Sequence, residues 1–148
     1  MASVALRRMT AEDKDIFFEM SREFYSCGAA HAPIPEEYRT SFWNEVVSGG
    51  PVNAYIIVCD GEVAGYALVA YYASQEYGGK IALFDELFIK SALRGLGIGK
   101  KVFELVESSG AVAVRLEVEK GNLRAMKLYR ELGYEEFDYI QMSKKLKR

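Results

Sequence analysis

The spacing of apolar residues over the first third of the chain predicts one strand followed by two helices. Residues 4–9, Val-Ala-Leu-Arg-Arg-Met, alternate well enough to predict a strand. Thr10 and Asp13 have the spacing of a capping box at the start of a helix, and apolar residues then recur on one helical face. Pro35 suits the first turn of a second helix, and residues 49–51, Gly-Gly-Pro, end it.

The middle of the chain has the pattern of a β hairpin, a third strand, a helix and a further strand. Residues 54–59 and 63–72 are apolar runs joined by Asp-Gly at 60–61, a dipeptide typical of a tight hairpin turn. A third apolar run, residues 81–89, leads into a glycine-rich stretch, after which apolar residues recur at helical spacing. Residues 114–119 alternate again, which indicates a strand with one buried face.

The C-terminal part predicts a last helix and two last strands. Asn122 is suited to begin the helix and Gly133 to end it, and residues 134–137 and 139–143 have the pattern of strands. We therefore predict one mixed α/β (α+β) domain over residues 1–148. About four helices flank its central, mostly antiparallel sheet of seven strands.

The composition provides enough apolar material for a core and too little positive charge for nucleic acid. Hydrophobic residues make up 50% of the chain and charged residues 27%. A chain of 148 residues buries roughly two thirds of its surface on folding. The formal net charge of -2 provides no basic field for a phosphate backbone, so we do not expect nucleic acid as a partner.

Cysteine usage and hydropathy favour a cytoplasmic protein. Cys27 and Cys59 lie far apart and belong to no CxxC pair, which argues against a zinc site and against a disulfide framework. His31 has no second histidine or carboxylate at ligand spacing, so we expect no metal. No stretch approaches the roughly 18 apolar residues of a membrane span, and we therefore expect no membrane partner.

Glycines occupy every second position of residues 95–99, where a predicted strand turns into a helix. The missing side chains let backbone N–H groups approach a ligand, and the positive end of the helix dipole favours an anion. Arg94, Lys100 and Lys101 add positive charge around the same segment. The spacings of a Walker loop and of a dinucleotide fingerprint are both absent. The pattern predicts a pyrophosphate site of another kind, and a tight turn without a ligand is the alternative.

Two motifs connect this loop with a known family. Residues 94–99, Arg-Gly-Leu-Gly-Ile-Gly, match the signature Q/R-x-x-G-x-G/A, and residues 122–129 match N-x-x-A-x-x-L-Y. With Gly133-Tyr134 just after them, the chain resembles the GNAT superfamily of N-acetyltransferases. The resemblance covers about residues 4–146, and its specific part is 81–134.

The resemblance implies that acetyl-CoA is the co-substrate and that no metal takes part. In that family the loop wraps the pyrophosphate of coenzyme A. The strand before the loop splays from its neighbour, and its backbone pairs with the pantetheine arm. Carried onto this sequence, acetyl-CoA binding is assigned to Leu87, Phe88, Ile89, Arg94, Gly95, Leu96, Gly97, Ile98, Gly99, Lys100, Asn122 and Tyr129.

Acetyl transfer to an amine requires a base, because an ordinary primary amine is protonated at neutral pH. Presenting the neutral amine costs about 4–5 kcal/mol unless the site lowers its pKa. Glu86 and Asp85 precede the loop and resemble the acidic pair of diamine and aminosugar acetyltransferases, and we rank Glu86 first as the base. Glu117 is the third candidate, at a position similar to one in the ribosomal-protein N-terminal acetyltransferases. A chain of water molecules without a single base stays open.

Tyr129 is the candidate acid for the leaving thiolate. In similar proteins a tyrosine at the matching position lies near the thioester sulfur, and a phenol can donate a proton or a hydrogen bond. Tyr129 also falls on the apolar face of its helix, so a tyrosine that only packs in the core is the alternative.

These observations predict an acetyl-CoA-dependent N-acetyltransferase. We expect it to transfer the acetyl group directly to a primary amine of a small molecule, polyamine-like or aminosugar-like, or of a peptide. The alternative is a non-catalytic acetyl-CoA-binding regulatory module, which a missing tyrosine or missing carboxylates would have favoured. A homodimer, common among similar proteins, is a further expectation.

Overall fold

The computed structural model describes residues 2–27, 30 and 32–148. The chain divides into two compact units, Met1–Glu117 and Val118–Arg148. Within the described residues, the first unit holds one sheet of five strands in the order β1-β2-β3-β4-β5. The second unit contains a single α-helix, α4, in the described chain. The prediction of one domain over residues 1–148 stays a prediction.

The elements follow the predicted order from the first strand to the last helix. Strands β1 to β4 pair antiparallel in sequence order, and β5 lies parallel to β4 after the helix that connects them. The bounds are β1 Val4–Arg8, α1 Lys14–Ser26, α2 Glu36–Val47, β2 Asn53–Cys59, β3 Glu62–Ser74, β4 Gly79–Ile89, α3 Ile98–Glu107, β5 Ala113–Leu116 and α4 Leu123–Glu131, with short 3-10 helices η1 Ala11–Asp13 and η2 Ser91–Leu93.

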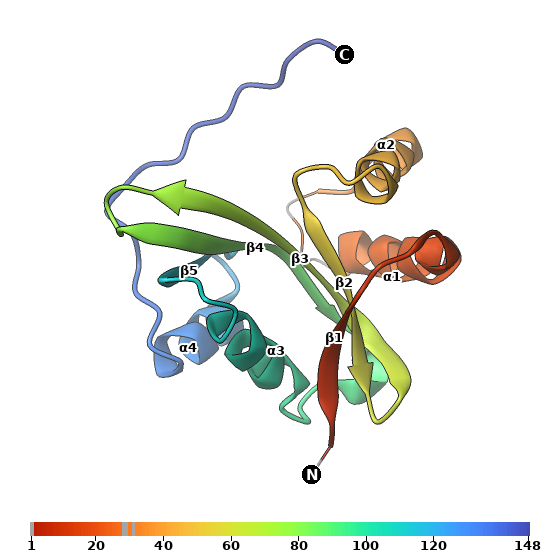
Figure 1. The fold of residues 1–148 in the computed structure, drawn as a ribbon, viewed down its shortest axis with the longest axis horizontal. Helices are drawn as coiled ribbons and strands as arrows, with labels where there is room; N and C mark the ends of the chain where they lie inside the picture. Colours follow the sequence, from red (N-terminus) through yellow and green to blue (C-terminus); the bar gives the residue numbers. More distant parts are fainter. Residues whose placement is uncertain (1, 28–29, 31) are drawn as a thin grey trace. The chain divides into compact units, whose positions relative to one another are not determined.

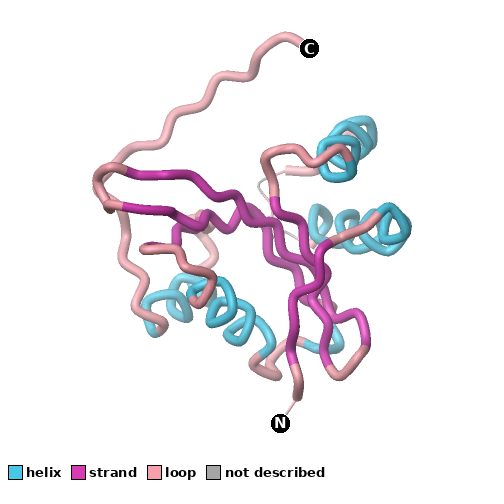
Figure 2. The backbone as a smooth tube through the Cα atoms, in the orientation of Figure 1, coloured by secondary structure: helices cyan, strands magenta, loops and turns pink. Residues whose placement is uncertain are grey.

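In the first unit, helices cover both faces of the sheet. Helices α1 and α2 lie on one face and α3 on the other (Figure 1; Figure 2 shows the same layers by element type). Phe17 of α1 packs against Trp43 of α2 and Tyr66 of β3, with ring centroids 5.7 and 5.0 Å apart. On the other face, Phe84 of β4 meets Phe103 of α3 at 4.5 Å.

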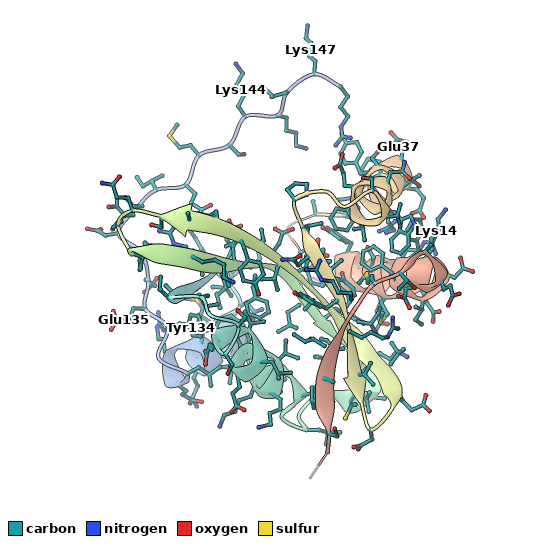
Figure 3. The ribbon with its side chains drawn as sticks, in the orientation of Figure 1. Lys14, Glu37, Tyr134, Glu135, Lys144 and Lys147 are labelled. Carbon is teal, nitrogen blue, oxygen red and sulfur yellow. The ribbon has the colours of Figure 1, made fainter. Side chains whose placement is uncertain are left out.

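Side chains fill the layer between the sheet and helices α1 and α2, as Figure 3 shows. The labelled Lys14 and Glu37 point away from that layer. Among the described residues, no helix has the length and apolar character needed to cross a membrane.

A β-bulge in β4 decides which of its side chains face each helix layer. Leu68 of β3 pairs with Glu86, but the next residue, Val69, pairs with Phe84, so Asp85 is an extra residue on β4. Without the bulge, Phe84 and Glu86 would lie two positions apart on one face. The extra residue instead allows Phe84 to pack under α3 while Glu86 faces α1.

The local signals of the N-terminal half have the predicted geometry. The backbone N–H of Thr10 donates to the Asp13 carboxylate at 2.7 Å, and the capping box is present. The hairpin turn between β2 and β3 places Asp60 at φ 50° and Gly61 at φ 85°. Left-handed backbone at both central turn residues matches the right-handed twist of the flanking strands.

The ends of α4 also follow the sequence prediction. The Asn122 side chain accepts a hydrogen bond from the backbone N–H of Ala125 at 3.2 Å, which caps the first turn. Gly133, at φ 92°, donates to the Arg130 carbonyl at 3.0 Å. This left-handed residue closes the helix as a C-terminal glycine does.

The prediction of seven strands is wrong in its last two members. The described chain has five strands, and residues 134–148 form none. An alternating segment becomes a strand only where a neighbour supplies the second half of a hydrogen-bonded ladder, and this segment forms no ladder. Its apolar side chains stay exposed, at 45% for Phe137, 65% for Tyr139, 91% for Ile140 and 92% for Met142.

Candidate active site

The last part of β4 keeps one backbone edge open. Strand β5 pairs with β4 only from Ile81 to Phe84, so residues 85–89 have no strand partner on that side within the described chain. An open edge offers N–H and C=O groups to an extended ligand. Leu87, Phe88 and Ile89 lie on it, and the Phe88 side chain is buried, so Phe88 can offer only its backbone.

The glycine-rich loop that follows presents bare backbone. Gly95 and Gly97 have φ angles of 78° and 80°, a left-handed conformation that residues with a Cβ rarely adopt. A Cβ added at Gly95, Gly97 or Gly99 would have no atom within 4 Å. The space over the loop therefore fits a group that approaches the backbone, as a pyrophosphate would.

Helix α3 begins at this loop and directs its N-terminus into it. Gly97 is the N-cap, and its carbonyl accepts the first helical hydrogen bond, from Lys101 N–H at 3.1 Å. The N–H groups of the first turn therefore precede the helical ladder and are suited to an anion. Ile98 is 2% exposed and fixes the helix start to the core, whereas Leu96 is 66% exposed.

The predicted cations around the loop have different surroundings. Arg94 donates from Nε to the Ile89 carbonyl at 2.8 Å, and its guanidinium lies 5.6 Å from the Phe88 ring centroid. Arg94 thus ties the loop to the end of β4. Lys101 pairs with a glutamate of its own helix at 2.8 Å, and Lys100 is exposed in the first turn.

On the other side of β4, two tyrosines hold the Glu86 carboxylate. Tyr25 of α1 donates its hydroxyl to Oε2 at 2.7 Å, and Tyr66 of β3 donates to Oε1 at 2.7 Å. Burial raises the pKa of Glu86, the two phenol donors and the Arg39 charge lower it, and the Asp85 charge raises it. Burial and the Glu86 charge raise the pKa values of both tyrosines, so both stay protonated donors.

Two further carboxylates, those of Asp85 and Glu117, belong to the same region as Glu86. We call these three side chains the carboxylate cluster. The Asp85 carboxylate accepts no hydrogen bond in the part of the chain that the structure describes. Although its side chain reaches solvent, the protein around it raises its pKa by desolvation, and the Glu117 charge raises it further. Glu117 directly follows β5. Asp85 thus lies within electrostatic range of both Glu86 and Glu117, the other two carboxylates that the sequence predicts as candidate bases.

Two predicted site residues belong to the second unit. Tyr129 of α4 is partly buried, and burial raises the pKa of its phenol, which therefore stays protonated at neutral pH. Its ring meets that of Tyr134 at 6.2 Å. Asn122 uses its side-chain oxygen to cap α4, which leaves the amide nitrogen outside this cap.

Sequence reasoning missed several residues behind Glu86. Arg39 and Ser21 are 4% and 3% exposed, and Arg39 Nε donates to Ser21 Oγ at 2.9 Å. Ser21 lies on α1, Arg39 on α2 and Tyr66 on β3. Because they belong to three separate elements, no sequence motif could have grouped them. The one available signal was an arginine among apolar residues of a predicted helix.

Among the described residues, no group of three or more histidine, cysteine or acidic side chains is placed to hold a metal ion. His31, the histidine of the sequence, lies outside the described residues.

Comparisons with known proteins identify the family of this chain. Residues 14–134 match the Acetyltransferase (GNAT) family. The thialysine N-epsilon-acetyltransferase of Bos taurus is 36% identical over 145 residues, which cover 90% of this chain and 85% of that protein. Its counterpart from Sus scrofa is 30% identical over 144 residues, with the same coverage of 90% and 85%.

Solved structures share the fold. The crystal structure of a possible acetyltransferase from Clostridium difficile 630 has a TM-score of 0.79 at 16% identity, covering 100% of this chain and 99% of that chain. AAC(6')-Iy in complex with the bisubstrate analogue CoA-S-monomethyl-acetylneamine has a TM-score of 0.74 at 15% identity, covering 97% and 99%. At these identities the structures support the fold alone. GNAT acetyltransferases use acetyl-CoA, and relatives of this chain acetylate amines. The chain belongs to the Acetyltransferase (GNAT) family and is an N-acetyltransferase.

Proposed function

We propose that this enzyme acetylates a primary amine of a small molecule that carries a second positive charge. The observation behind this proposal is the carboxylate cluster, which lies beside the open edge of β4. The Glu117 charge raises the pKa of Asp85, and the Asp85 charge raises that of Glu86. Negative charges this close together attract a cation more strongly than one isolated carboxylate does. A diamine or an aminoalkyl amino acid suits such a site better than a neutral amine or an acidic peptide.

The related enzymes support this class of acceptor. The name of the bovine and porcine relatives specifies thialysine, whose side chain ends in a primary amine. Thialysine carries more than one amino group, which fits the acidic surroundings of Asp85 and Glu86.

We assign the general base to Asp85 and the binding of the acceptor's charge to Glu86. A base needs an accessible lone pair and a pKa nearer to neutral than that of an ordinary carboxylate. Asp85 reaches solvent, and both burial and the Glu117 charge raise its pKa. Glu86 already accepts two hydrogen bonds from tyrosines, which favour its ionised form. This assignment revises our sequence-based ranking, in which Glu86 came first.

The other predicted residues suit the binding of acetyl-CoA, which supplies the acetyl thioester. The bare loop at 95–99 and the start of α3 would hold the pyrophosphate, with Lys100 nearby. The open edge at 87–89 would pair with the amides of the pantetheine arm. Asn122 and Tyr129 keep the roles that the family resemblance assigns, and the protonated Tyr129 phenol would donate to the leaving sulfur.

A panel of acceptors tests the proposal. The purified protein is incubated with acetyl-CoA and propylamine, 1,3-diaminopropane, thialysine, neamine or a short neutral peptide, and release of the coenzyme A thiol is followed. We expect kcat/KM for the diamine and for thialysine to exceed that for propylamine by at least about tenfold, the equivalent of one favourable charge contact. Equal rates with propylamine and the diamine, or a preference for the peptide, would contradict the proposal.

A further inference from the structure

A line of buried polar side chains runs from α2 to the Glu86 carboxylate. Arg39 donates from Nε to Ser21 Oγ at 2.9 Å, and Ser21 lowers the pKa of the Tyr66 phenol, as a neighbouring hydroxyl that points its proton at the phenol oxygen does. Tyr66 in turn donates to Glu86 Oε1 at 2.7 Å. Because a hydroxyl can accept one hydrogen bond while it donates another, the three groups can point their protons in one direction, toward the carboxylate.

The members of this line are buried to a degree that needs an explanation. Arg39, Ser21 and Tyr66 are 4%, 3% and 0% exposed. Burying polar groups costs free energy unless they are hydrogen-bonded, and replacing them with apolar side chains would cost the fold little or nothing. A chain of donors that ends on an anion is worth more than its separate bonds, since each bond polarises the next.

We propose that Arg39, Ser21 and Tyr66 form a donor chain that keeps the Glu86 carboxylate anionic and fixed, as the anchor for the positively charged acceptor. Tyr25 supplies the second donor directly, on Oε2. Arg39, Ser21 and Tyr66 are then positioning residues, because they act through Glu86. The proposed role toward the acceptor rests on the function proposed above, whereas the effect on Glu86 itself does not.

The charged and titratable groups around Glu86 oppose one another. Tyr25 from α1, Tyr66 from β3 and Arg39 from α2 favour its ionised form, whereas Asp85 from β4 and burial favour the protonated form. The charge of Arg39 is shared with Glu36, with which it forms an ion pair. Loss of any donor should therefore raise the pH at which Glu86 takes up a proton.

Carbon-13 NMR of the glutamate carboxyl groups measures this directly, without any substrate. The Glu86 signal is identified by its absence in Glu86→Gln, and its titration is followed in the wild type, Tyr66→Phe, Ser21→Ala and Arg39→Gln. We expect Tyr66→Phe to move the midpoint upward by about one pH unit, a roughly tenfold gain in proton affinity. Ser21→Ala and Arg39→Gln should move the midpoint in the same direction by smaller amounts, because neither residue donates a hydrogen bond to Glu86 itself.

Tyr71→Phe is the matched control. It removes a phenol hydroxyl from the same strand, β3, where it bonds Ser109 and not Glu86. Its Glu86 midpoint should equal that of the wild type. A midpoint that stays unchanged in a folded Tyr66→Phe protein overturns the donor chain. If the midpoint moves in Tyr66→Phe but in neither Ser21→Ala nor Arg39→Gln, Ser21 and Arg39 do not belong to the donor chain.

The role toward the acceptor has its own measurement. With 1,3-diaminopropane, we expect KM to rise as the pH falls through the Glu86 midpoint, and this rise to begin about one pH unit higher in Tyr66→Phe. Saturating kcat should change by less than roughly threefold, because the chain does not touch the reacting atoms. If the Glu86 midpoint shifts in Tyr66→Phe but the pH dependence of KM does not, Glu86 does not bind the charge of the acceptor and this role is overturned. If the wild type acetylates no amine of the panel, the proposed function fails, while the NMR titration still decides on the donor chain.

Discussion

The glycine loop follows β4, and Asp85 and Glu86 of the carboxylate cluster lie within that strand, but the loop and the cluster are built in opposite ways. The loop at 95–99 consists of backbone, left-handed glycines and open space. The cluster depends on side chains, and Glu86 alone involves donors from α1 and β3, with Arg39 of α2 behind them. The loop would recognise a group common to the whole family, whereas the surroundings of Glu86 combine side chains from three separate elements.

This difference has an energetic side. A backbone site needs no desolvated charge and costs the fold only the restriction of a few glycines. A carboxylate held by side chains carries a cost of burial that its donors must offset. We therefore expect changes in the loop to affect acetyl-CoA alone, and changes in the cluster to affect pH dependence, acceptor binding and stability together.

The largest effect is expected from Asp85→Asn. The substitution keeps the volume but removes the proton acceptor, so kcat/KM should fall by roughly 10²–10⁴-fold. In the wild type, the rate should decline as the pH falls through the raised pKa of Asp85, above the range of an ordinary aspartate. That acidic limb should vanish in Asp85→Asn, as initial rates across pH will test. If the acidic limb remains in Asp85→Asn but disappears in Glu86→Gln, Glu86 is the general base and Asp85 binds the charge of the acceptor.

A change confined to the loop comes next. Gly99 has an ordinary φ and no atom within 4 Å of an added Cβ, so Gly99→Leu should not lower the melting temperature of the free protein. The leucine would occupy the space over the loop, and we expect acetyl-CoA affinity to fall at least about 100-fold, the equivalent of one or two lost hydrogen bonds to a charged group. Titration calorimetry provides the measurement. Gly97 is less suitable, because its φ of 80° would strain any substitution.

Ser108→Leu is the matched control for the loop. It adds the same side chain to the same helix, at its other end and about 14 Å away along the axis. Its acetyl-CoA affinity should equal that of the wild type. If both variants lose binding, general damage to α3 explains the loss and the loop assignment fails.

Tyr129→Phe tests a group outside both regions. The variant retains the ring and its contact with Tyr134 but loses the hydroxyl that would serve the leaving sulfur. We expect turnover to fall roughly 10–100-fold while acetyl-CoA affinity changes by only a few-fold. Unchanged turnover on a true acceptor would make Tyr129 a packing residue, the alternative that its position on an apolar helix face already suggests.

The sequence predicts best what is encoded within one stretch of chain. The capping box at Thr10, the hairpin turn at Asp60, the loop at 95–99 and the caps of α4 each depend on a few consecutive residues. The order of elements follows from periodicity for the same reason. The two final strands failed because a strand requires a partner, and the alternation of residues 134–143 contains no information about one.

The carboxylates were predictable as a set but not in their roles. Which residue faces α1 depends on the bulge at Asp85, and that bulge arises from the register between β3 and β4. The donors to Glu86 come from positions 25 and 66, so only the tertiary fold unites them. Motifs therefore yield a residue-by-residue prediction for the cofactor side of such an enzyme more readily than for its acceptor side.

The smallest expected effect is a difference in stability between variants of the half-buried Glu86 and of Asp13, a carboxylate that stabilises the fold. Asp13 forms a two-point ion pair with Arg7 at 2.9 Å and closes the capping box with Thr10. The hydrogen bond from Arg7 holds the pKa of Asp13 below its ordinary value, whereas burial raises that of Glu86. The two groups should therefore contribute to stability with opposite signs near neutral pH.

For Asp13, the folded state prefers the ionised form, so its contribution is fully present above the pKa of the unfolded chain and is lost as the pH falls through the lower, folded pKa. Asp13→Asn should cost about 1–3 kcal/mol of unfolding free energy at pH 7, and the deficit should shrink in acid. For Glu86, the folded state binds the proton more tightly, so the cost is present at pH 7 and is relieved as the pH falls through its raised pKa. Glu86→Gln should thus lose less stability at pH 7 than Asp13→Asn does. Urea unfolding of both variants at several pH values measures this, and a larger loss for Glu86→Gln would show that the donors outweigh burial and that the cluster stabilises the fold.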